Sequence, residues 1–315
     1  MPVNSFILVF NEMKRFLVTL MGAFAVIFVL DRAVGFMLKT GYEHTRYGAI
    51  GRKNEIVNHV KSDIIILGSS RALHHYVPQV ISDSTGLSCY NCGQGGQGII
   101  YHYALLRAMT ERYMPKMIVY ELTYAYDVET SDNSRFLGEI RTLNHRGCAD
   151  SILYRLGNME KLKMMSHIYP YNSLVFHIIG DEWQKKNLTA QYGYIPKFGR
   201  LNPAYTKPKA PTKDSTVDSV KLSFLKKFIS EFAPQTKLVV FVSPEYEIKA
   251  GDRNYSMVQQ LCQEHGVAFV NRNSDPDISH NPSLFIDNVH LNDEGATRYT
   301  RSICGIIRDV LNAVR

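Results

Sequence analysis

Hydrophobic residues in most of the chain fall into short continuous blocks separated by longer mixed stretches. The first block after residue 60 runs from Asp63 to Leu67, is rich in β-branched residues and ends at Gly68. Apolar blocks of this kind are typical of strands buried on both faces of a parallel sheet. Four further blocks share this character and predict four more strands, at 87–91, 116–122, 238–242 and 267–270.

The stretches between these blocks have the spacing of amphipathic helices. From Ser215 to Phe232, apolar residues recur three and four positions apart. The same pattern predicts helices at 77–84, 99–113, 253–265 and 292–314. Strands that alternate with helices predict a three-layer α/β/α fold with a parallel five-stranded sheet of the flavodoxin-like kind.

The N-terminal region has a different pattern. Fifteen residues from Phe16 to Leu30 carry no charge, Asp31 and Arg32 follow, and a second apolar run ends at Leu38. A membrane span needs about 20 residues, so both runs together predict a transmembrane helix, with the two charges near an interface. Two basic residues just before the first run favour a cytoplasmic N-terminus. A cleaved signal peptide and a buried core helix stay open as alternatives.

This pattern divides the chain into a membrane anchor at 1–40, a tether at 41–61 and an α/β domain at 62–315. The domain is therefore expected on the extracytoplasmic side, periplasmic or at the cell surface. An insert at about 123–213 is rich in tyrosine and lacks strand blocks, with helices expected at 151–166 and 172–190. Its place after a strand makes it a candidate lid or substrate wall.

Composition narrows the possible partners. Hydrophobic residues make up 45% and charged residues 21% of the 315 residues, as in an ordinary globular protein. The net charge of +7 comes without a basic run or a nucleic-acid motif, so no nucleic-acid partner is predicted. Cys89 and Cys92 form a C-x-x-C without a second metal-binding pair. No metal and no organic cofactor is predicted, and the protein partners stay unknown.

The first predicted strand leads into Gly68, Ser69, Ser70 and Arg71. In open parallel sheets the residues after the strands form the functional edge. A serine on a tight strand-to-helix turn is exposed beside free backbone N–H groups, which suits a nucleophile. Helix capping is the alternative role for a serine here.

The second predicted strand leads into a glycine-rich loop, from Asn91 to Gly98, with four glycines in its last six residues. Such a loop can point N–H groups at an oxyanion. It lacks the Gly-Lys-Ser/Thr ending of a phosphate loop, and a plain flexible turn is the alternative.

Before the last predicted helix, Asp287 and His290 form a D-x-x-H pair. A carboxylate three residues from an imidazole can orient the ring and stabilise its protonated form. The ring can then accept the proton of a serine hydroxyl.

The order of these three motifs resembles that of the SGNH (GDSL-like) hydrolase family, over about 62–128 and 236–314. The resemblance implies Ser70 as the nucleophile, with Asp287 and His290 completing a triad. It also matches Asn91 and Gly96 to the second block of the family. Gly96 is thereby implied as an oxyanion donor beside the backbone N–H of Ser70.

One block departs from the family pattern, because Ala125 stands where the third block has an asparagine. The usual third oxyanion contact is therefore missing, and loss of one donor typically costs about 10²–10³ in rate. Tyr124, Tyr126, Gln94 and Gln97 are candidate replacements. The predicted substrate-contacting residues are Arg71, Asn91, Gln94, Tyr124 and Tyr126.

The resemblance implies cleavage of acyl esters. A membrane anchor and an extracytoplasmic domain suggest an O-acyl group, such as acetyl, on an envelope polysaccharide, or a smaller ester. Membrane-anchored proteins of this kind that act on envelope glycans, including the teichoic-acid D-alanyl transfer protein, show a similar Gly-Ser-Ser start. Two alternatives stay open: an O-acyltransferase with the same triad, and a non-catalytic glycan-binding or assembly protein.

Overall fold

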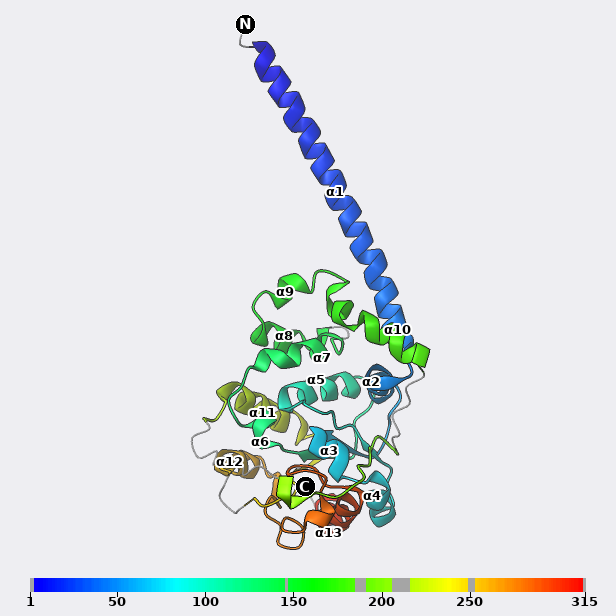
Figure 1. Cartoon of the computed structure of the whole chain (residues 1–315). Helices are drawn as coiled ribbons and strands as arrows, with labels where there is room; N and C mark the ends of the chain where they lie inside the picture. The colour runs from blue at the N-terminus through cyan, green and yellow to red at the C-terminus, as the bar shows by residue number, and fades with distance from the viewer. Residues whose placement is uncertain (1–2, 145–146, 185–190, 206–215, 249–252, 314–315) are drawn as a thin grey trace.

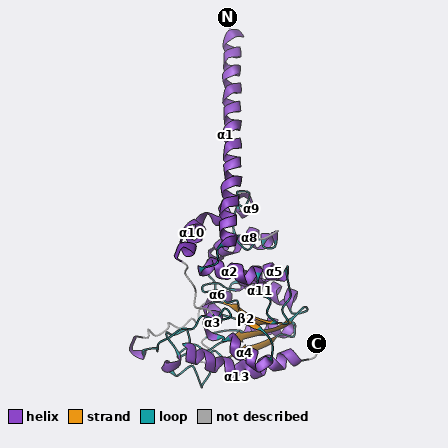
Figure 2. Ribbon diagram, turned by 90° about the vertical axis from the view of Figure 1, so that its right-hand side faces the viewer, coloured by secondary structure: helices purple, strands orange, loops and turns teal. Residues whose placement is uncertain are grey.

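A single long helix projects from an α/β domain in the computed structural model (Figure 1). The structure describes residues 3–144, 147–184, 191–205, 216–248 and 253–313. The projecting helix is α1, Val3–His44, and the domain follows it without a break in the described chain. Figure 2 shows from the side that α1 leaves one end of the domain.

The sheet confirms the predicted fold class. Its five strands lie in the order β2-β1-β3-β4-β5, and every neighbouring pair is parallel. The strands are β1 (Ile64–Gly68), β2 (Cys89–Asn91), β3 (Met117–Glu121), β4 (Lys237–Val242) and β5 (Ala268–Asn271). Because β1 lies between β2 and β3, the chain changes direction across the sheet there. Ligands bind at such switch points, beyond the carboxyl ends of the strands.

Alternate residues of each strand point into two separate cores. In β1, Ile65 and Leu67 pack on one side, whereas Ile64 and Ile66 pack on the other. All four are fully buried, which explains why the strand shows no polar alternation in the sequence.

Helices cover both faces, as the alternating pattern predicts. The side of Ile65 is covered by α2 (Gly48–Asn58), α5 (Ile99–Thr110), α11 (Ser219–Phe232) and α12 (Ser256–Glu264). The side of Ile64 is covered by α3 (Ser70–His75), α4 (Pro78–Thr85) and α13 (Asp293–Asn312). The predicted helix boundaries agree with these to within a few residues.

Helix α1 is the one helix in the described part of the chain that is long and apolar enough to cross a membrane. From Val9 to Leu30 its side chains are exposed to solvent. This part of the helix is apolar on all sides and packs against no other described element, which suits a lipid surrounding. A signal sequence near the N-terminus has the same length and composition.

The predicted tether at 41–61 is wrong. Helix α1 continues to His44, and α2 then packs against the domain with Ile56 and Val57 in the core beside α5. The polar side chains that suggested a linker are also used in packing: Arg52 and Lys53 are buried, at 9% and 5% exposure. The apolar stripe of α2 is narrow, and for this reason its sequence resembles that of a linker.

The predicted insert divides into two parts. Its first part holds α6 (Tyr124–Asp127), α7 (Leu137–Arg141), α8 (Asp150–Leu156), α9 (Glu160–Lys163) and α10 (Val175–Gln184). Figure 1 shows α7 to α10 gathered above α5, near the domain end of α1. The helix predicted at 172–190 is described as far as Gln184, and residues 185–190 lie outside the described residues. Its second part, residues 191–201, lies beside the end of β2, where the carbonyl of Tyr192 accepts the N–H of Asn91.

Candidate active site

Ser70 follows a tight turn that requires glycine at position 68 and in which Ser69 caps α3. Gly68 ends β1 at φ +137°, and a Cβ there would lie 2.4 Å from the carbonyl oxygen of Glu121. Ser69 caps α3: its hydroxyl accepts the N–H of Arg71 and contacts the Thr123 hydroxyl at 2.6 Å. Ser69 is fully buried, whereas Ser70 at the first helical position is partly exposed. The turn therefore buries one serine and exposes the next.

The structure brings Ser70, His290 and Asp287 together. The Nε2 atom of His290 lies 2.8 Å from the Oγ of Ser70. The Nδ1 atom of the same ring lies 2.9 and 3.0 Å from the two carboxylate oxygens of Asp287. Nucleophile, base and orienting carboxylate thus form one hydrogen-bonded chain, the arrangement that activates a serine hydroxyl.

The Asp287 carboxylate is held in its charged form. Its Oδ1 also accepts the backbone N–H groups of Val289 and His290, each at 2.8 Å. Partial burial by itself raises the pKa of this carboxyl. The hydrogen bonds from the His290 ring and from these N–H groups outweigh burial and hold the pKa of Asp287 below its usual value. An ionised carboxylate fixes the proton on Nδ1 of His290, so that Nε2 faces Ser70 as the acceptor.

The glycine-rich loop lies directly beside Ser70. A Cβ placed on Gly95 would come within 4.0 Å of the Ser70 Cβ, and Gly96 has a φ of +74°, a conformation that favours glycine. The N–H of Ser70, at the first position of α3, has no acceptor within that helix. The loop therefore lies next to Ser70, and the oxyanion role of the N–H groups of Ser70 and Gly96 stays a prediction.

Asn91 supports the loop and does not face a substrate, which corrects the prediction. It is fully buried at the end of β2. Its amide donates to the carbonyls of Ala72 (2.7 Å) and Tyr76 (3.0 Å), and its Oδ1 accepts the N–H of Gly93 (3.0 Å). Both polar atoms of its side chain are therefore used to fasten the start of the loop to α3.

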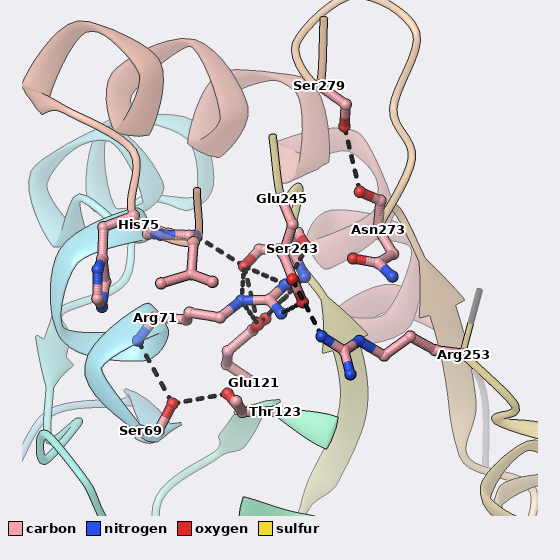
Figure 3. A network of polar contacts seen from close by, with 12 residues as sticks. Ser69, Arg71, His75, Glu121, Thr123, Ser243, Glu245, Arg253, Asn273 and Ser279 are labelled. Atoms are coloured by element: carbon pink, nitrogen blue, oxygen red, sulfur yellow. Dashed lines mark hydrogen bonds and ion pairs between the residues drawn. The ribbon is translucent and has the colours of Figure 1, made fainter. Parts of the chain in front are cut away.

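Arg71 does not contact a substrate either. Its side chain is 2% exposed and points into a buried network with Glu121, Ser243 and Glu245 (Figure 3). Its Nε lies 3.1 Å from Glu121 and its Nη1 lies 2.7 Å from Glu245. Burial by itself lowers the pKa of the guanidinium, but the two carboxylates beside it raise that pKa well above its ordinary value. Arg71 is thus the central cation of a structural ion cluster.

The same network reaches the loop that carries His290. The N–H of Leu291 donates to Nε2 of His75 at 3.0 Å, so the proton of that ring lies on Nδ1. Nδ1 faces the hydroxyl of Ser243 at 2.8 Å, and this hydroxyl donates to Glu121 at 2.8 Å. His75 therefore fixes the backbone next to His290 from the helix that begins with Ser70.

The sequence motifs do not point to His75, Glu121, Ser243 or Glu245 as members of this network. A signal was present, because Glu121 ends β3 and Ser243 directly follows β4. Polar residues at the ends of two neighbouring buried strands meet at one sheet edge.

The two tyrosines expected at the site differ in how deeply they are buried. Tyr124 is 4% exposed and packs its ring edge-on against Tyr255, which corrects its prediction as a substrate contact. Tyr126 is half-buried beneath the guanidinium of Arg135, 5.2 Å from its ring centre. Gln94 is also half-buried, and its Oε1 accepts from Arg52 at 3.3 Å. Tyr126 and Gln94 stay candidates for substrate contact.

The turn that follows β3 is built around Asp127. Its carboxylate accepts the N–H groups of Ile99 and Thr123, each at 2.6 Å, and the hydroxyl of Tyr120 at 2.8 Å. Ala125 is exposed in this turn and has no side-chain donor. Burial raises the pKa of Asp127 to about 7.

Residues 191–201 form a strap that joins the parts of the site. The carbonyl of Tyr192 accepts the N–H of Asn91 (2.9 Å), and that of Ile195 lies 2.7 Å from Nδ1 of His74. Near its end, the carbonyl of Gly199 accepts the Asn292 amide at 2.8 Å. The strap therefore connects the glycine-rich loop, α3 and the His290 loop.

Three buried histidines predict that acid destabilises the fold. Burial lowers the pKa of His74 to about 4 and that of His102 to about 3, and it lowers the pKa of His75 well below its ordinary value. An unfolded chain takes up these protons near pH 6.5. The free energy of unfolding is therefore expected to fall as the pH drops from about 6.5 towards 4, by up to about 1.4 kcal/mol per pH unit for each histidine.

Denaturant unfolding of the detergent-solubilised chain at pH 7 and pH 5 measures this loss. His74→Asn, which keeps a donor for the Ile195 carbonyl, is expected to reduce it. The exposed His59 provides the control, and His59→Asn should leave the loss of stability between pH 7 and pH 5 unchanged. If His74→Asn loses as much stability between pH 7 and pH 5 as the unchanged protein, His74 does not contribute to the destabilisation by acid.

Comparisons with known proteins do not assign a family. No family model matches the chain, and no curated protein matches it. One similar solved structure is an alpha/beta hydrolase enzyme from the metagenome of Lake Arreo, Spain, with 10% identity and a TM-score of 0.42, covering 82% of this chain and 100% of that one. Another is described as a platelet activating factor from Streptococcus pneumonia, with 13% identity and a TM-score of 0.40, covering 90% and 99%. At these values the structural likeness supports no functional assignment. The function proposed below rests on the geometry of the site.

Proposed function

We propose that this protein is a serine-dependent acyl-ester hydrolase. The observation that carries the proposal is the hydrogen-bonded chain from the Ser70 hydroxyl through both nitrogens of His290 to the Asp287 carboxylate, with contacts of 2.8 and 2.9 Å. These residues come from two elements separated by 220 positions in sequence. A non-catalytic protein that only kept the fold has no need of this alignment.

The proposed reaction begins when the Ser70 oxygen attacks the ester carbonyl while Nε2 of His290 accepts its proton. The backbone N–H groups of Ser70 and Gly96 hold the oxyanion of the tetrahedral intermediate. The protonated His290, stabilised by Asp287, then gives its proton to the departing alcohol. A water molecule, deprotonated by His290, releases the acid from Ser70 and restores the enzyme.

The proposed substrate is an O-acyl group, such as acetyl, on an extracytoplasmic polysaccharide. Two observations support this choice. Helix α1 has the composition of a membrane anchor with the domain beyond it. The strap beside the site exposes the aromatic rings of Tyr192 (62%) and Phe198 (79%), and aromatic faces suit contact with sugar rings.

A fluorophosphonate probe tests the proposed chemistry. The full chain in detergent is expected to form one covalent adduct, located by mass spectrometry on the peptide that contains Ser70. Release of acetate from an O-acetylated envelope polysaccharide, compared with release from a small aryl acetate, tests the substrate. Absence of an adduct at Ser70 rejects the hydrolase, whereas labelling without release from the polymer rejects only the polysaccharide.

A further inference from the structure

The end of the domain nearest α1 exposes five large apolar side chains. Phe176 and Ile179 belong to α10, at 88% and 63% exposure, and Met159, Leu162 and Met165 lie in and beside α9, at 62%, 56% and 65%. We call this set the α9–α10 face. Exposed apolar side chains concentrated at one end of a domain mark a surface that another phase or molecule covers.

Helix α1 is fastened to the segment that joins α9 to α10. The Asp31 carboxylate accepts the N–H of His167 at 2.9 Å and also the hydroxyl of Ser166. Arg32 donates to the carbonyl of Met165 at 3.2 Å. A Cβ on Gly35 would lie 2.4 Å from the Cβ of His167, so the two chains touch. The segment after α9 therefore lies level with residues 31–35 of α1, whereas α10 lies level with Gly41, where an added Cβ would come 3.0 Å from Ile178.

The end of the apolar part of α1, at Leu38, lies between these two levels. Residues 16–30 extend for only about 22 Å, less than the roughly 30 Å hydrocarbon core of a bilayer. Beyond the Asp31–Arg32 pair, Phe36 and Met37 are 68% and 70% exposed and continue the apolar surface. Donors from the domain satisfy the Asp31 carboxylate, which lowers the cost of placing it near lipid.

We propose that the α9–α10 face lies in the headgroup–acyl boundary of a lipid bilayer and forms a second membrane contact beside α1. The inference rests on α1 crossing that bilayer. Helix α10 has the required two-sided character: Ile178 is 9% exposed and packs with Tyr42 and Ile50, whereas Phe176 and Ile179 face outward. Exposed Lys161 and Lys163 in α9 complement anionic lipid headgroups, as in interfacial amphipathic helices.

The geometry has a functional consequence. A domain that is joined to its membrane anchor by a flexible hinge can change its orientation. Here α1 is one continuous helix to His44, and α10 packs beside its end (Figure 1). Contact between the α9–α10 face and lipid then fixes the orientation of the domain relative to the bilayer and keeps Ser70 at a constant distance from it.

Site-specific fluorescence in nanodiscs tests this contact with the full chain. Four of the five cysteines are buried, so Cys148→Ser leaves a background suited to labelling. An environment-sensitive fluorophore is attached at Phe176→Cys, and at Phe198→Cys as a matched exposed control. Phe198 lies next to Lys197, whose carbonyl accepts the N–H of Asp293 in α13. Figure 1 shows α13 at the end of the domain opposite α1.

The label at position 176 is expected to shift to the blue and to lose at least half its emission when the nanodisc lipids are brominated. The label at 198 is expected to keep its emission, and a label at Phe24→Cys in α1 must be quenched. Equal emission at 176 and 198 in brominated lipids overturns the proposal. So does a label at 176 that is protected from iodide yet not quenched by lipid, because a protein partner then covers the face. No outcome depends on ester cleavage, so the hydrolase proposal is tested separately.

Discussion

Ser70→Ala is expected to abolish labelling by a fluorophosphonate and to lower kcat/KM for a small aryl ester by at least about 10³-fold. The hydroxyl that lies 2.8 Å from Nε2 of His290 is the only atom of the triad able to form the covalent acyl intermediate. Residual activity then comes from the oxyanion site and from binding alone. Stopped assays with purified full-length chain measure the loss, and the unfolding transition confirms that the variant is folded.

The neighbouring serine provides the matched control for this prediction. Ser69→Ala removes a buried capping hydroxyl and is expected to cost about 1 kcal/mol of stability, yet to keep the covalent adduct. His290→Ala is expected to lose as much activity as Ser70→Ala, and the double variant no more than either one, because the two groups act as a unit. Labelling of Ser70→Ala at the wild-type level rules out Ser70 as the nucleophile.

Arg71→Met is expected to lower the free energy of unfolding by about 3–5 kcal/mol. The substitution keeps an apolar chain of similar length but leaves Glu121 and Glu245, at 0% and 3% exposure, without their central cation. Removing one partner of a buried ion cluster leaves uncompensated charge in a medium that solvates it poorly. Denaturant titration of the solubilised chain measures the change.

An arginine outside the network controls for the loss of positive charge. Arg298 in α13 is exposed, and Arg298→Met is expected to change stability by no more than about 0.5 kcal/mol. Arg71→Lys should fall between the two, because an ammonium group cannot reach two carboxylates with the planar geometry of a guanidinium. If Arg71→Met is as stable as Arg298→Met, the cluster does not stabilise the fold.

The Arg71 cluster contributes to catalysis because it helps to position Ser70 and His290. Arg71 follows Ser70 directly, and His75 of the same short helix holds the N–H of Leu291 beside His290. Both partners of the 2.8 Å contact are thus fixed by groups buried behind them. Such support keeps a catalytic hydrogen bond aligned, as precise sites require.

The motifs with local physical meaning could be predicted from the sequence. Five apolar blocks with helical stretches between them define a parallel α/β sheet, and the residues after β1 and β2 must share its functional edge. The turn at Gly68 and the D-x-x-H spacing are likewise local features, since a three-residue separation suffices to place Asp287 against the His290 ring.

The assignments that failed depended on which way a side chain points. Arg71 and Asn91 stand at the functional edge in sequence, but both turn inward and hydrogen-bond within the protein. Tyr124 is covered by Tyr255, which comes from a distant segment. The supposed tether at 41–61 failed in the same way, because α2 has a polar sequence and is nevertheless buried against α5.

The sequence by itself determined the class of fold, the apolar N-terminal helix and the identities of Ser70, Asp287 and His290 as candidate partners. Those features follow from periodicity, from composition and from short spacings, which act within a few residues. Only the tertiary structure decided that the Ser70 hydroxyl meets Nε2 of His290, that Arg71 is buried between Glu121 and Glu245, and that α10 lies beside the end of α1. Contacts between elements depend on how both faces of the sheet are packed, and no local pattern records that packing.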